Sequence, residues 1–214
     1  MAKKTRTSKP TQATPAKKLP IGWIAGGVLA VALMVAMVLS FGSLEDAGPE
    51  FGTPAVTGDP LAPLPEGDAD PAIGQPIPSV VGADFDGNAV SIGPDDGPHA
   101  IVFLAYWCSH CQAEVPAVQE WIDSGAVPDG VRLVSVSTAM DKGRPNYPAS
   151  AWLDREGWTP PVVADDQAQS VFKAFGGTGF PYWVFVSEDG TVAGRAAGEL
   201  GVDTVAAAME SLAP

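Results

Sequence analysis

Residues 99–116 read HAIVFLAYWCSHCQAEVP, and this stretch decides which fold the chain is expected to adopt. Residues 99–105 form a short apolar run rich in β-branched and aromatic side chains, which is typical of a strand buried on both faces. Apolar residues then recur at helical spacing over 109–123, so a helix is expected to follow at once. The two cysteines of the chain, Cys108 and Cys111, therefore lie at the junction of a buried strand and a helix.

A Cys-x-x-Cys pair at such a junction indicates redox chemistry. The spacing lets the first thiol stand exposed at the helix N-terminus while the second points inward within disulfide reach. Backbone N–H groups and the positive end of the helix dipole stabilise a thiolate at the first position. Cys108 is therefore predicted to be the attacking thiol, and Cys111 the resolving thiol that attacks the mixed disulfide formed with a partner.

Two other interpretations of the cysteine pair are weaker. A structural disulfide that closes so short a loop removes little chain entropy. A structural metal site needs four ligands, whereas the chain offers two cysteines and two histidines, His99 and His110. His110 also lies inside the loop of the pair, where its ring cannot easily turn toward the same ion. We expect neither a bound metal nor a cofactor.

Three neighbours of the pair are candidate site residues. His110 can add a donor or a positive charge beside the Cys108 thiolate, which would make the disulfide more oxidising. Trp107 is expected to shield the sulfurs and to offer a flat apolar contact to a substrate chain. Glu114 lies one helical turn after Cys111, where a buried carboxylate could relay a proton to or from that thiol; a solvated helix residue is the alternative.

The rest of the sequence from residue 72 alternates between strands and helices. Hairpins are expected at 76–81 with 89–92 and at 182–186 with 191–195, further strands at 131–137 and 161–164, and further helices at 149–156, 167–175 and 202–212. This order predicts an α/β domain in which a mixed sheet is flanked by helices around one core.

The N-terminal region has the pattern of a membrane anchor. Residues 1–20 contain half of the 12 basic residues and no acidic one, and residues 21–41 form an uncharged, apolar run of 21 residues. A helix of that length reaches roughly 30 Å, which spans the hydrocarbon core. By the positive-inside rule, residues 1–20 are a cytoplasmic tail and the chain after the anchor is extracytoplasmic. A cleaved signal peptide is the competing interpretation.

Residues 42–71 are rich in Pro, Gly, Asp and Glu and show neither strand nor helix periodicity. We interpret them as a flexible acidic linker that holds a domain of residues 72–214 away from the membrane. After residue 18 the chain has six basic and 25 acidic residues, a formal balance of −19. Such a surface repels phosphate backbones and excludes nucleic-acid binding as a function of this domain.

Residues 72–212 resemble the TlpA/ResA-like branch of the thioredoxin superfamily, which includes cytochrome c-maturation thioredoxins and actinobacterial DsbE-type proteins. The resemblance rests on three motifs, namely the segments 107–111 (WCSHC), 114–116 (EVP) and 177–182 (GTGFPY). It implies a thioredoxin-like fold, a kink of the active-site helix at Pro116, and an extra helix and strand within residues 141–164. It also implies that Pro181 is a cis proline that turns the backbone of Phe180 toward Cys108, where an extended substrate strand can pair.

The expected activity is thiol–disulfide exchange with exported proteins, by a single-pass protein of the cell membrane recharged by a membrane redox partner. Many reducing relatives have a proline just before the second cysteine, where this chain has His110, as in strongly oxidising DsbA-like proteins. Oxidative folding is therefore the first hypothesis. The alternative, favoured by the anchor and Glu114, is a disulfide reductase of cytochrome c maturation. A non-catalytic copper chaperone is the alternative from another class.

Overall fold

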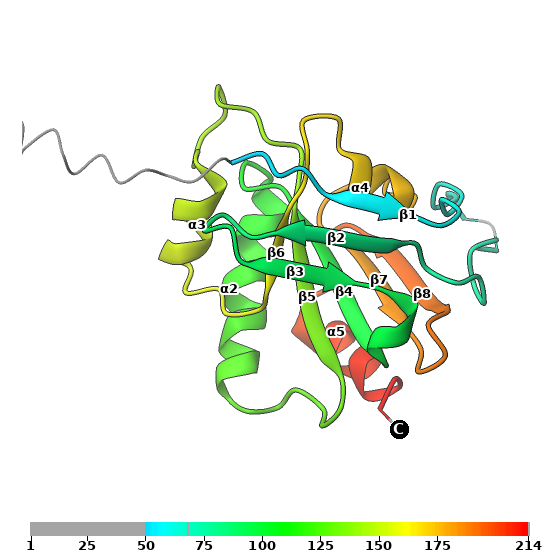
Figure 1. The fold of residues 1–214 in the computed structure, drawn as a ribbon. Helices are drawn as coiled ribbons and strands as arrows, with labels where there is room; N and C mark the ends of the chain where they lie inside the picture. Colours follow the sequence, from blue (N-terminus) through cyan, green and yellow to red (C-terminus); the bar gives the residue numbers. More distant parts are fainter. Residues whose placement is uncertain (1–49, 68, 214) are drawn as a thin grey trace, which may run out of the picture. The chain divides into compact units, whose positions relative to one another are not determined.

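A five-stranded mixed sheet forms the centre of the domain (Figure 1). The computed structural model describes residues 50–67 and 69–213. The sheet has the order β6-β5-β4-β7-β8, with bounds β4 His99–Leu104, β5 Arg132–Ser137, β6 Val162–Ala164, β7 Tyr182–Val186 and β8 Val192–Ala197. β4 pairs parallel with β5 and antiparallel with β7, so it is the central strand.

Other elements cover both faces of the central sheet. A small antiparallel sheet, β1-β2-β3, packs on one face, with bounds Ala55–Thr57, Ser79–Ala83 and Ala89–Ile92. The other elements are α2 Ser109–Asp123, α3 Ala149–Arg155, α4 Ser170–Ala174, α5 Val202–Glu210 and the short 3-10 helix η1 Pro94–Asp96.

All six residues of β4 are buried, and successive side chains enter different cores. Ile101 and Phe103 pack with residues of α4 and of the small sheet. Val102 and Leu104 pack on the other face with residues of α2, α3 and α5. The burial of β4 on both faces explains its unbroken apolar sequence, and its carboxyl end leads directly to Cys108.

The predicted mixed sheet, the hairpin β2–β3 and the inserted helix and strand, α3 and β6, are all confirmed. The predicted helix at 167–175 is too long, because Gln169 has a left-handed backbone with φ 59° and the helix begins at Ser170. The carboxylate of Asp166 accepts hydrogen bonds from both the backbone N–H and the hydroxyl of Ser170. These hydrogen bonds satisfy the backbone N–H of the first helical residue, which has no partner within the helix.

The prediction that residues 42–71 form a flexible linker is wrong from Glu50 onward. Glu50 is buried, and its carboxylate accepts hydrogen bonds from the backbone N–H and hydroxyl of Ser150 at the start of α3. β1 pairs with β2, and Leu61 is buried in the core. The domain therefore begins about 20 residues earlier than the change in composition indicated.

A partly buried ion pair holds the end of the same segment on the domain. The guanidinium of Arg195 in β8 binds the carboxylate of Asp70, with an Nε to Oδ2 distance of 2.8 Å, and also donates to the carbonyl of Ala62. The side chain of Arg195 has no exposed surface. These contacts join single residues at irregular spacing, which is why no periodicity in the sequence revealed them.

The predicted tail, anchor and residues 42–49 of the linker lie outside the described residues. Within residues 50–67 and 69–213, no helix combines the length and the apolar composition that crossing a membrane requires.

Candidate active site

Cys108 occupies the N-cap of α2, where the chain leaves β4. Its backbone N–H donates to the carbonyl of Ala105 at 2.9 Å, and its own carbonyl accepts from the N–H of Gln112 at 3.0 Å. Cys108 is half-buried, Cys111 is fully buried, and both are free thiols. The predicted difference in exposure between the two thiols is confirmed, while their roles as attacking and resolving thiols stay predictions.

The surroundings of Cys111 favour its protonated form. Burial raises the pKa of the Cys111 thiol, and the neighbouring Cys108 and Glu114 raise it further. The backbone N–H of Ala105, 3.5 Å from the Cys111 sulfur, acts in the opposite direction but is the weaker influence. At neutral pH Cys111 is therefore a thiol, and it needs a proton acceptor before it can attack a disulfide.

The peptide bond between Phe180 and Pro181 is cis, as the family resemblance implied. The carbonyl of Phe180 accepts a hydrogen bond of 3.5 Å from the Cys108 sulfur. The ring of Phe180 stacks on Phe172 of α4, with ring centroids 4.7 Å apart. The loop before β7 thus brings a backbone acceptor to the exposed thiol.

Trp107 lies partly buried beside the pair. Its indole N–H donates to the carbonyl of Ala139 at 2.7 Å, and its ring meets the ring of Phe180 edge to face, with centroids 5.9 Å apart. The guanidinium of Arg144 stands 4.6 Å from the centre of the indole ring, a cation–π contact. Trp107 is therefore partly exposed next to Cys108, as predicted, with a positive charge over its ring, while its contact with a substrate chain stays a prediction.

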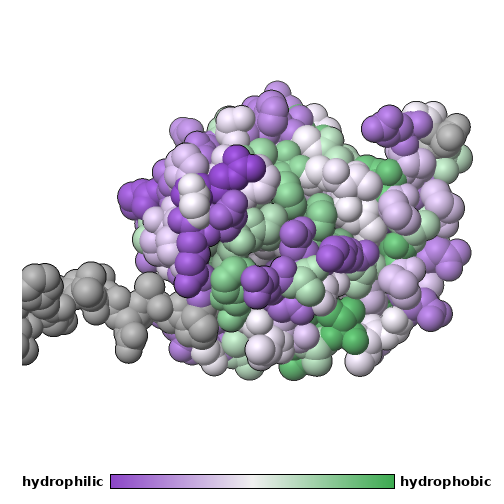
Figure 2. All heavy atoms as spheres, turned by 90° about the horizontal axis from the view of Figure 1, so that it is seen from above, coloured by the Kyte–Doolittle hydropathy of each residue, from purple (hydrophilic) through white to green (hydrophobic). Residues whose placement is uncertain are grey.

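The surface around these residues is mixed in polarity. Figure 2 views the domain from above Figure 1, and on this face hydrophobic surface lies among hydrophilic side chains.

Glu114 is buried, with only 3% of its surface exposed, so the alternative of a solvated helix residue is wrong. Its Oε2 accepts the indole N–H of Trp183 at 2.8 Å. Its Oε1 accepts the backbone N–H groups of Leu200 and Gly201, at 2.7 and 3.0 Å, where α5 begins. The carboxylate therefore joins the active-site helix to β7 and α5, and its proposed proton relay stays a prediction.

The side chain of His110 contacts Glu199, and it does not make the hydrogen bond to Cys108 that the sequence suggested. Its Nδ1 lies 3.0 Å from Oε2 of Glu199, in the loop between β8 and α5, and both side chains are substantially exposed. Within residues 50–67 and 69–213, the Cys108 sulfur donates a hydrogen bond to the Phe180 carbonyl and forms none with His110. Glu199 escaped the sequence analysis because 89 positions separate it from His110.

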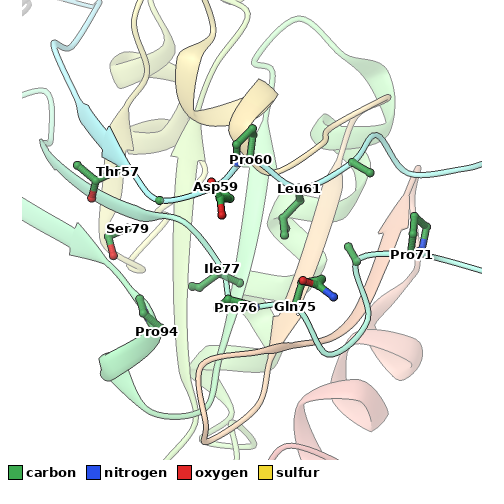
Figure 3. Close-up of a pocket in the computed structure, with 13 residues that line it drawn as sticks. Thr57, Asp59, Pro60, Leu61, Pro71, Gln75, Pro76, Ile77, Ser79 and Pro94 are labelled. Carbon is green, nitrogen blue, oxygen red and sulfur yellow. The ribbon is translucent and has the colours of Figure 1, made fainter.

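One cavity of the described part of the chain lies away from the cysteines. It has a volume of about 600 Å³ and is lined by residues of 57–62, 71–79 and Pro94 (Figure 3). No cysteine or histidine lines it. In the described part of the chain, no group of three or more His, Cys, Asp or Glu side chains is placed to hold a metal ion.

The Redoxin family model matches residues 72–211. A search of curated proteins found no significant match.

Three solved structures share the fold. A DsbF homologue from Corynebacterium diphtheriae is 18% identical, with a TM-score of 0.57, and the match covers 72% of this chain and 100% of that chain. A thiol:disulfide interchange protein of the thioredoxin family from Chlorobium tepidum TLS is 22% identical, with a TM-score of 0.53 and coverage of 68% and 98%. The structure of MTB dsbF in its mixed oxidised and reduced forms is 26% identical, with a TM-score of 0.51 and coverage of 62% and 93%.

The family match spans the strand–helix junction that carries Cys108 and Cys111, and the solved structures share the fold over most of their own length. The chain belongs to the redoxin family, has a thioredoxin-like fold and is a thiol–disulfide oxidoreductase.

Proposed function

We propose that the chain introduces disulfide bonds into exported proteins by way of Cys108 and Cys111. One observation carries the proposal: the half-exposed sulfur of Cys108 stands at a helix N-terminus facing the Phe180 carbonyl, with the buried Cys111 behind it. Only one of the two sulfurs can therefore meet a client thiol.

The client is oxidised in two successive exchange steps. A client thiolate attacks the Cys108 sulfur of the Cys108–Cys111 disulfide, forming a mixed disulfide and releasing the Cys111 thiolate, which takes up a proton. A second client thiolate attacks the client sulfur of the mixed disulfide and releases Cys108. The client loses two electrons and two protons, and the cysteine pair gains them. A membrane redox partner then reoxidises the pair.

The protein surface near Cys108 supports client chains as substrates. Trp107 and Phe180 offer apolar contact, and Pro181 ends the loop that faces the thiol. We expect an extended client segment to lie along this loop and to pair with its backbone.

Reduction of disulfides in cytochrome c maturation is the second candidate, and the contact between His110 and Glu199 favours it. A carboxylate 3.0 Å from the imidazole offsets the positive charge that would make the pair strongly oxidising. The buried Glu114, one turn after Cys111, fits either direction because it can accept or return a proton.

We further propose that residues 21–41 anchor the protein in the cell membrane, with the catalytic domain outside. Glu50 already belongs to the domain, so only the eight residues 42–49 connect the proposed anchor to it. Eight residues can separate the two by at most about 29 Å. Fractionation should find the full-length protein in membranes, and added protease should remove its domain from intact cells. A soluble form that begins near residue 43 would instead show cleavage.

The direction is tested with the full-length chain purified in detergent. The oxidised chain is mixed with a reduced, unfolded disulfide protein, and the reduced chain with insulin. Faster regain of native disulfides, with slow insulin reduction, would support the oxidase. Rapid insulin reduction with little oxidation would favour the reductase, and stoichiometric Cu(I) binding with neither activity would favour a copper chaperone.

A further inference from the structure

The loop between β8 and α5, residues 198–201, contacts both halves of the active site. The backbone N–H of Gly198 donates to the carbonyl of Pro181 at 2.8 Å. The next residue, Glu199, meets His110, and the two after it donate to Glu114. The loop thus links the Cys-x-x-Cys helix to the loop of the cis proline.

The backbone around Glu199 is held on both sides. Gly198 and Gly201 have φ values of 95° and 73°, a left-handed region that favours glycine. Hydrogen bonds hold the backbone at both of these glycines. The position of the Glu199 side chain near α2 is therefore set by a short, fixed loop.

The position of Glu199 matters for the charge near Cys108. His110 is two residues after Cys108 in the first turn of α2, so a protonated imidazole there would favour the Cys108 thiolate and with it the reduced pair. A carboxylate 3.0 Å from Nδ1 offsets that charge. An exposed ion pair of this kind contributes little to folding stability, so its main effect is expected on the redox equilibrium.

We propose that Glu199 is a positioning residue that lowers the reduction potential of the Cys108–Cys111 pair by holding the imidazole of His110 and offsetting its charge. This inference rests on the proposed redox role of the two cysteines. The β8–α5 loop then helps to set the reduction potential of the cysteine pair.

The test is the equilibrium of the full-length chain in detergent with glutathione at pH 7. In this equilibrium two glutathione thiols give two electrons and two protons to the Cys108–Cys111 disulfide, yielding the dithiol and glutathione disulfide. Glu199→Gln should shift the constant three- to tenfold toward the dithiol, which corresponds to a potential higher by about 15–30 mV. Glu188→Gln, which removes an exposed carboxylate at the far end of β7, is the matched control and should leave the constant unchanged.

A double-mutant cycle separates action through His110 from direct action on Cys108. In a His110→Ala background, Glu199→Gln should shift the logarithm of the constant by less than half as much. An equal shift in both backgrounds, or none in the wild-type background, would overturn the inference while leaving thiol–disulfide exchange intact. A wild-type chain that does not exchange with glutathione would overturn both the inference and the proposed function.

Discussion

The side chain of Glu114 accepts a hydrogen bond of 2.8 Å from the indole N–H of Trp183, so the helix that carries the cysteines is tied to strand β7 by a buried carboxyl group. The second oxygen binds the start of α5 through Leu200 and Gly201. A group that satisfies three N–H donors is part of the structure of the site, whatever part it takes in proton transfer.

Glu114→Gln should therefore destabilise the domain. An amide keeps one accepting oxygen but turns an NH2 group toward at least one of the N–H donors, which should lower the free energy of unfolding by about 1–3 kcal/mol. Denaturant unfolding of the two proteins measures the difference. Glu120→Gln, an exposed position on the same helix, is the control and should change little. Equal stability of the Glu114 and Glu120 variants would show that the three contacts are unimportant.

The two thiols should differ strongly in reactivity. Because burial raises the pKa of Cys111, that sulfur is protonated and shielded at pH 7, and iodoacetamide should modify Cys108 at least about tenfold faster. Peptide mass spectrometry after short labelling of the reduced protein gives both rates. In denaturant the two rates should converge. Comparable rates in the folded protein would contradict the assignment of Cys111 as the inner thiol.

The membership of residues 50–71 in the domain can be tested at Asp70. Asp70→Asn would leave the buried guanidinium of Arg195 without its counter-ion and should cost about 3 kcal/mol of unfolding free energy at pH 7. Asp59→Asn changes an exposed carboxyl of the same segment and should be nearly neutral. No loss in the Asp70 variant would mean that the segment is dispensable.

The ion pair between Asp70 and Arg195 should make the free energy of unfolding depend on pH. The hydrogen bond from Arg195 lowers the pKa of Asp70 below its ordinary value in the unfolded chain. The folded state therefore binds this proton less readily, and the pair contributes stability above the ordinary value of about 3.9 that is lost as the pH falls through the folded value. The stability difference between wild type and Asp70→Asn should shrink as the pH falls below about 4. A constant difference down to pH 2 would contradict this linkage.

Regular elements could be predicted from the sequence because their periodicity is local. The helix at Ser109–Asp123 and the strand at Tyr182–Val186 have the predicted bounds. The exposed and buried thiols followed from the spacing of Cys108 and Cys111, and the cis isomer at Pro181 was implied by the family resemblance.

Contacts between distant single residues could not be predicted in the same way. Glu199 meets His110 across 89 positions, and Arg195 meets Asp70 across 125. Neither pair leaves a pattern in composition or spacing, since each depends on how β8 packs in the finished fold. For the same reason the acidic, Pro-rich segment before residue 72 was interpreted as a linker although it contributes Leu61 to the core.

The central claim is that Cys108 is the sulfur that bonds to the client in either direction of exchange, so that it attacks a client disulfide and Cys111 resolves the product, and trapping of mixed disulfides tests it most directly. Full-length Cys111→Ser and Cys108→Ser variants are produced in the cell, thiols are blocked with acid and alkylating agent, and disulfide-linked complexes are separated without reductant and identified by mass spectrometry. Cys111→Ser should accumulate client proteins bound through Cys108, because its Cys108 thiolate can still attack a client disulfide while no neighbouring Cys111 thiol is present to release the product, whereas Cys108→Ser should trap almost none. Equal trapping by the two variants, or linkage through Cys111 in the Cys108 variant, would contradict the account.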